Sequence, residues 1–160
     1  MDSGIEGKFY TKDSRRFIYA DNIWNVRDLG GIPVSNGGYI AYNKIFRGGE
    51  LKGTRINAST VGLKYLKDLG INCEVDLRND NESKRQTSTM ISGAEYFKES
   101  FVTFGRIKNL SNSSKASIKR VFEYVADRIH AGKVIYAHCV FGYHRCGFLM
   151  SLIEGVLGAK

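Results

Sequence analysis

The sequence is poor in cysteine and proline and lacks long apolar runs, and these scarcities exclude several classes of protein. Its three scattered cysteines form an odd number, which argues against a disulfide framework and indicates a reducing compartment. Cys139 and Cys146 have no second cysteine pair, so we expect no metal. No apolar run is long enough to span a bilayer, and residues 1–6 carry acids instead of a signal-peptide core. We therefore expect a cytoplasmic protein without a membrane span, with export by another route left open.

The composition predicts one globular domain. The chain has 160 residues, of which 42% are hydrophobic and 25% are charged. We expect one core over residues 25–160, preceded by a polar and aromatic lead-in over residues 1–24. The formal net charge of +8 suits an anionic partner, whether nucleic acid, an acidic membrane or a phosphorylated substrate, and does not choose among them.

Hydrophobic periodicity predicts alternating helices and strands. Gly37-Gly38 indicates a hairpin between 32–34 and 39–41, and Asn57 or Ser59 could cap a helix over 58–68 with apolar positions at Val61, Leu63, Leu66 and Leu69. Further strands are expected at 45–51, 71–77, 96–101 and 134–137, and further helices at 114–131 and 146–157. This order favours an α/β fold with a central mixed sheet flanked by helices. The last helix is apolar on nearly all faces, which predicts a covering segment.

The most informative stretch runs from Val134 to Gly147. An apolar strand leads into Cys139, Arg145 follows six positions later, and Gly147 opens an apolar helix. Such a loop aims successive N–H groups inward in front of a helix N-terminus, which makes an anion cradle. We expect Cys139 to be a thiolate nucleophile, and the N–H groups of residues 140–145 (Val140, Phe141, Gly142, Tyr143, His144 and Arg145) to hold phosphate with the Arg145 guanidinium. The alternative is a structural buried cysteine.

A leaving alkoxide or phenolate needs a general acid, and the loop contains no carboxylic acid. His144 is the only titratable candidate inside it, and its alternative role is that of a solvent-facing loop histidine. Asp28, Asp76 and Asp80 could reach the site only if the fold brings their loops there.

Basic residues outside the loop leave two interpretations open. Arg47 could reach an anion or be solvated. The segment from Ser100 to Val121 has five basic residues and no acid, and it is either a solvated face or an electrostatic funnel for an anionic substrate (Arg106, Lys108, Lys115, Lys119 and Arg120).

With these residues in view, the chain resembles the bacterial tyrosine phosphatase family that includes secreted lipid and protein phosphatases of intracellular pathogens. The resemblance covers about residues 22–160 and rests on four motifs in family order, at 25–31, 45–51, 75–78 and 138–147. It implies a phosphatase α/β fold, a phosphocysteine intermediate, and activity on phosphotyrosine and sometimes on phosphoserine or phosphoinositides, with neither cofactor nor nucleic acid. Motif residues Asp28, Arg47, Asp76, Arg78 and Cys146 become candidate supporting residues.

The chain departs from the family pattern inside the loop. Tyr143, His144 and Cys146 stand where the family commonly has lysine or a small residue, aspartate and threonine. The family also continues with further helices, so the resemblance implies a truncated chain. These departures keep a second hypothesis open, a phosphate-binding pseudophosphatase or defective remnant, and a sulfur-transfer protein is a third. Cys146 or Cys73 could also form a protective disulfide with Cys139.

Overall fold

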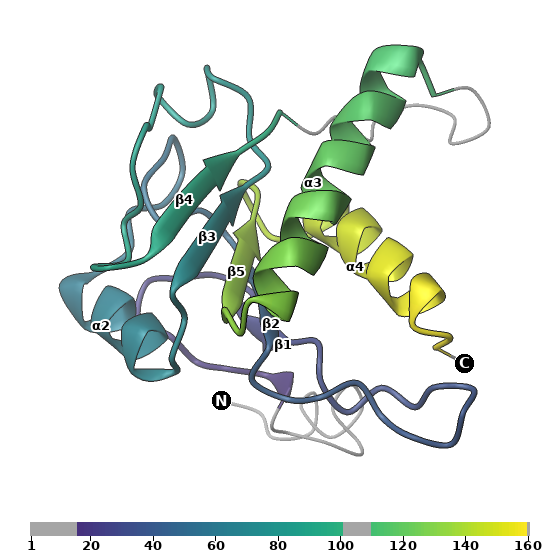
Figure 1. The fold of residues 1–160 in the computed structure, drawn as a ribbon. Helices are drawn as coiled ribbons and strands as arrows, with labels where there is room; N and C mark the ends of the chain where they lie inside the picture. The colour runs from purple at the N-terminus through teal and green to yellow at the C-terminus, as the bar shows by residue number, and fades with distance from the viewer. Residues whose placement is uncertain (1–15, 101–109, 160) are drawn as a thin grey trace, which may run out of the picture.

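The computed structural model describes residues 16–100 and 110–159, which form an α/β fold (Figure 1). A five-stranded sheet has the order β1-β2-β5-β3-β4, in which β1 is antiparallel to β2 and every other pair is parallel. The strands are β1 (Arg27–Asp28), β2 (Ile45–Gly48), β3 (Cys73–Asp76), β4 (Glu95–Lys98) and β5 (Ile135–His138). The helices are α2 (Thr60–Asp68), α3 (Asn112–His130) and α4 (His144–Val156). The predicted α/β class with a central mixed sheet is confirmed.

Helices cover both faces of the sheet, with α3 and α4 on one face and α2 on the other (Figure 1). The side chains of β5 alternate between the two faces of the sheet, because successive residues of a strand point to opposite sides. Ile135 and Ala137 join the apolar core beneath α3 and α4, whereas Tyr136 joins the core on the α2 side. The central strand is therefore buried on both faces, and Cys139 follows directly at its carboxyl end.

The predicted helix near residue 60 is confirmed, but one of its apolar positions is wrong. Ser59 caps α2 by accepting a hydrogen bond from the Gly62 backbone N–H at 2.9 Å, and Gly70 lies past its end with φ at +85°. Val61 is 69% exposed, because α2 turns Gly62 and Leu66 toward the core. A side chain at Gly62 would begin 2.1 Å from the Asp21 carbonyl oxygen, so close backbone packing sets this orientation.

The remaining elements agree with prediction apart from their ends. The hairpin forms with Gly37 at φ +89°, the last helix begins at His144 instead of Cys146, and the two-residue β1 lies where only a turn was expected. Predictions on Phe101, Arg106 and Lys108 fall outside the described residues. No helix in residues 16–100 and 110–159 combines the length and the apolar character needed to cross a membrane.

Arg78 lies at the centre of a fully buried group of charges beneath the sheet's carboxyl edge. Its guanidinium donates to Glu50 at 3.0 Å and to Asp76 at 2.7 Å, and also to the Lys52 carbonyl oxygen at 2.7 Å. Burial alone would raise the pKa of Asp76, but the charge of His138 and the hydrogen bonds from Arg78 lower it to about 2. Asp76 is therefore ionised. Arg78 joins it, at the end of β3, to Glu50, which follows the end of β2.

Replacing Arg78 by methionine should destabilise the protein strongly, because it leaves the buried Glu50 and Asp76 carboxylates without their cation. We expect a loss of about 3–5 kcal/mol in the free energy of unfolding, measured by urea denaturation. As a control, Lys64→Met breaks an exposed ion pair with Asp68 and should cost less than about 1 kcal/mol. Equal losses for the two variants would contradict this account of Arg78.

Candidate active site

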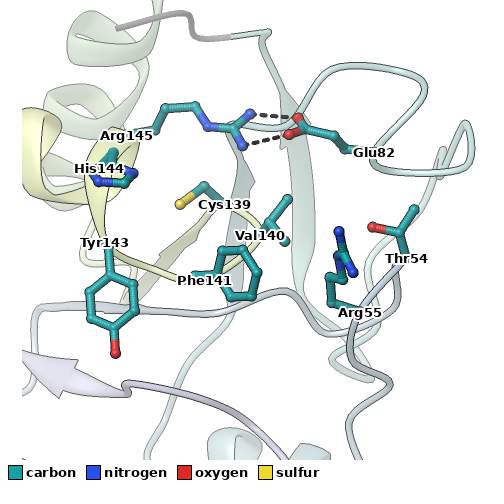
Figure 2. Close-up of a pocket in the computed structure, with 9 residues that line it drawn as sticks. All are labelled: Thr54, Arg55, Glu82, Cys139, Val140, Phe141, Tyr143, His144 and Arg145. Carbon is teal, nitrogen blue, oxygen red and sulfur yellow. Dashed lines mark hydrogen bonds and ion pairs between the residues drawn. The ribbon is translucent and has the colours of Figure 1, made fainter. Parts of the chain in front are cut away.

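The carboxyl ends of three parallel strands meet around Cys139. In the register of the sheet, His138 at the end of β5 lies opposite Gly48 of β2 and Asp76 of β3. A cavity of about 420 Å³ opens above Cys139 at this edge, where ligands of parallel sheets commonly bind (Figure 2). Its lining comes from three loops and comprises Thr54, Arg55, Glu82, Cys139, Val140, Phe141, Tyr143, His144 and Arg145.

Hydrogen bonds from neighbouring segments hold the carbonyl groups of the Cys139 loop on its outer side. The Glu50 backbone N–H donates to the Val140 carbonyl oxygen at 3.0 Å. The Gly142 carbonyl oxygen accepts from the Asn25 side-chain amide at 3.1 Å and from the Arg47 guanidinium at 2.8 Å. With the carbonyl oxygens bound from outside, the N–H groups are left for the inner side of the loop.

The backbone N–H groups of Gly142 and Cys146 indeed donate hydrogen bonds to the Cys139 sulfur. Gly142 has φ at +73°, and a Cβ there would lie 2.5 Å from the Gly48 carbonyl carbon, so no other residue fits this position. Two backbone N–H groups thus face the Cys139 sulfur, and glycine at position 142 is a steric requirement of the loop.

The Cys139 thiol is strongly acidified. A hydrogen bond from the Cys146 side chain makes the largest contribution; burial opposes it, and the Cys146 N–H, the Arg145 charge and the Gly142 N–H add to it. Together they lower the pKa of Cys139 to about 5, so the group is a thiolate at neutral pH. Cys146 therefore takes the place expected of a hydroxyl donor on α4.

Cys146 and Cys73 were both candidates for a disulfide with Cys139, and the structure separates them. Cys146 contacts Cys139, and its sulfur lies 3.6 Å from the Ala137 carbonyl oxygen. Cys73 lies at the start of β3, the opposite end of the sheet from the cavity, and its sulfur lies 3.6 Å from the Tyr124 hydroxyl. Of the two candidates, only Cys146 interacts with Cys139.

Arg145 is held in place by Glu82, a residue that the sequence prediction missed. Its two terminal nitrogens donate to the two Glu82 carboxylate oxygens at 2.6 and 2.8 Å (Figure 2). The hydrogen bond from Arg145 lowers the pKa of Glu82, so this carboxylate is ionised at neutral pH. Its only sequence signal was its place in the polar loop that follows β3.

Four other predicted site residues lie at the cavity or support the structure around it. His144 and Tyr143 line the cavity, and Arg47 supports the Cys139 loop from behind. Asp28 accepts hydrogen bonds from the Gly30 and Asn43 backbone N–H groups, each at 2.8 Å, and holds a turn.

Three more predicted residues lie outside the cavity lining. Asp76 and Arg78 are buried beneath it, and Asp80 pairs with Lys98. Asn25, which reaches the Cys139 loop through its side chain, was missed as a site residue although it begins the motif at 25–31.

The model of the tyrosine phosphatase family matches residues 18–160. The chain belongs to the tyrosine phosphatase family. A search of curated proteins finds no match. Membership supports a phosphatase function on phosphorylated substrates. The matched residues include the whole Cys139 loop and the segments that bind its carbonyl groups.

Removing the Cys146 thiol should make Cys139 less acidic. The measurement is the rate at which iodoacetamide alkylates Cys139 as a function of pH. In Cys146→Ala we expect the midpoint of this curve to rise from about pH 5 to about pH 6–7, because the Cys139 thiolate loses its side-chain donor. Burial raises the pKa of Cys73 and of Cys146, so iodoacetamide reports Cys139 in this range. Cys146→Ser keeps a donor and should keep the wild-type midpoint; an unchanged midpoint in Cys146→Ala would refute the role of Cys146.

Proposed function

We propose that this protein is a phosphatase that hydrolyses phosphotyrosine, and other aryl phosphates, through a phosphocysteine intermediate on Cys139. The observation that carries the proposal is the acidified Cys139 thiol at the base of a cavity, inside a loop whose N–H groups face the sulfur. Phosphoserine and phosphoinositides are secondary candidates because the same phosphate-binding loop would accept any phosphomonoester.

The proposed reaction has two steps. The Cys139 thiolate attacks phosphorus in line, forms a sulfur–phosphorus bond and expels the substrate oxygen. Water then cleaves that bond, which releases inorganic phosphate and restores the thiolate. The N–H groups of residues 140–145 and the guanidinium of Arg145 would stabilise the equatorial oxygens in both steps. Glu82 would position Arg145, since it already holds both terminal nitrogens.

We assign protonation of the leaving group to His144. Among the described residues that line the cavity, Glu82 is the only carboxylate, and its ion pair with Arg145 keeps it deprotonated. Asp28, Asp76 and Asp80 do not line the cavity. An imidazolium is the usual alternative to a carboxylic acid as a proton donor, and His144 adjoins Arg145 at the cavity wall.

The aromatic side chains at the cavity favour an aryl substrate. Phe141 lines the cavity and stacks on Trp24, with ring centroids 5.6 Å apart and an interplanar angle of 16°. Tyr143, also in the lining, is 54% exposed. Aromatic faces of this kind stack on a phenyl ring more favourably than on an aliphatic alcohol.

Hydrolysis of p-nitrophenyl phosphate should depend on Cys139 in two ways. Cys139→Ser should abolish turnover, because a serine hydroxyl is not ionised at neutral pH. In the wild-type protein, kcat/KM should fall tenfold per pH unit below about pH 5, where the thiolate becomes protonated. A folded wild-type protein without turnover, or a Cys139→Ser variant that retains it, would contradict the proposed mechanism.

The role of His144 predicts a dependence on the leaving group. His144→Ala should lower kcat/KM about 100-fold for phenyl phosphate, whose phenolate needs a proton, and only a few-fold for p-nitrophenyl phosphate. His144→Asp keeps a proton donor and should retain most activity on both substrates. Tyr143→Phe removes the hydroxyl group of the neighbouring side chain in the same wall and should change kcat/KM by the same factor for both substrates. Equal losses on both substrates in His144→Ala would exclude His144 as the acid.

A phosphate-binding pseudophosphatase is the second candidate function. It is favoured by the same observation that makes His144 necessary, the absence of a free carboxylic acid in the described lining of the cavity. Under this alternative, calorimetry would detect binding of inorganic phosphate to a protein that hydrolyses no aryl phosphate. His144→Asp would then raise turnover while phosphate affinity stays similar.

A further inference from the structure

Arg55 lies in the wall of the cavity that faces the Cys139 loop. It comes from the loop that follows β2, together with Thr54, and both residues line the same cavity as Cys139. In Figure 2 these two side chains occupy the side opposite Tyr143 and His144. Arg55 is therefore a cation at the cavity that none of the sequence motifs singled out.

The loop that carries Arg55 is rigidly attached to the buried charges. One Glu50 carboxylate oxygen accepts the backbone N–H groups of Arg55 at 2.7 Å and of Ile56 at 3.0 Å, while its other oxygen binds Arg78. Gly53 is required there, since a Cβ would lie 1.8 Å from the same carboxylate. The loop wraps around Glu50, which fixes the backbone at Arg55 and leaves its exposed side chain at the cavity.

Of the two arginines in the described lining of the cavity, Arg145 has a carboxylate partner and Arg55 has none. Arg145 is the other arginine of the lining, and Glu82 neutralises it through two hydrogen bonds. The Glu50 carboxylate receives the Arg55 backbone N–H and not its guanidinium. Within residues 16–100 and 110–159, the Arg55 guanidinium has no carboxylate partner. An anionic group of a ligand can supply that partner.

The volume and the lining of the cavity indicate the kind of ligand that would bring this second anion. About 420 Å³ exceeds the needs of one phosphate and one phenyl ring, so a neighbouring part of the substrate can enter as well. The stacked Phe141 and Trp24 rings favour an aromatic phosphate ester over an inositol headgroup. An aromatic ester joined to a nearby carboxylate is the chemistry of a phosphotyrosine peptide with an acidic residue.

We infer that Arg55 is a specificity-determining residue that binds the carboxylate of an acidic side chain close to phosphotyrosine in a peptide substrate. This inference rests on the proposed function for the place of the phosphotyrosine itself. It adds a second anchoring point across the cavity from Arg145, which would select acidic phosphopeptides over neutral ones.

The test compares phosphotyrosine peptides that differ by one Glu or Gln at each position from three before to three after the phosphotyrosine. At the best position, the wild-type protein should prefer the Glu peptide about fivefold in kcat/KM at low salt. In Arg55→Met this ratio should fall to one, and Arg55→Lys should keep part of it. Lys52→Met removes an equal charge from the same loop, from an exposed side chain outside the cavity lining, and should keep the full ratio.

The inference would be overturned by no Glu preference in the wild-type protein, by an Arg55→Met loss that is equal for the Glu and Gln peptides, or by an equal loss of the preference in Lys52→Met. A selective effect of Arg55→Met on soluble inositol bisphosphate, with none on the peptides, would also overturn it.

Equilibrium binding separates this inference from the proposed function. Fluorescence polarisation of the labelled peptides on Cys139→Ser protein measures the Glu-to-Gln ratio of Kd without turnover. Absence of hydrolysis by the wild-type protein would contradict the proposed function. A Kd ratio that depends on Arg55 would still support the subsite, and equal Kd values would overturn it.

Discussion

The ion pairs of Arg78 with Glu50 and Asp76 are the interaction on which the rest of the candidate site depends. They are fully buried, so each member needs the others to offset the loss of water. Through them, the end of β2, the end of β3 and the loop that carries Arg55 are joined at one point below the cavity. The Gln86 side-chain oxygen also accepts from Arg78 at 2.9 Å, which fixes the segment after Glu82.

The conformation of the Cys139 loop is held by hydrogen bonds from residues outside the loop. Asn25 and Arg47 bind the Gly142 carbonyl oxygen, and the Glu50 N–H binds that of Val140. The free energy needed to turn the Gly142 and Cys146 N–H groups toward the Cys139 sulfur therefore comes from contacts made on folding. Such preorganisation is what electrostatic stabilisation of a phosphoryl group requires.

The sequence predicted features that depend on local patterns and missed those that depend on long-range packing. The strand before Cys139, the loop and the following helix were predictable because an apolar run, a glycine and the position of Arg145 are local signals. The exposure of Val61 was not, since the position of the Asp21 carbonyl against Gly62 decides it. Glu82 reaches Arg145 across 63 residues, a pairing that only the folded chain defines.

The proposed mechanism requires Cys139 to accept the phosphoryl group. Its most direct test is to quench the turnover of an aryl phosphate in acid within the first catalytic cycle and to examine the peptides by mass spectrometry. We expect a phosphoryl group on the sulfur of Cys139, present during turnover and gone once substrate is exhausted. Steady turnover with the phosphoryl group on another residue, or with none on the protein at any time, would contradict it.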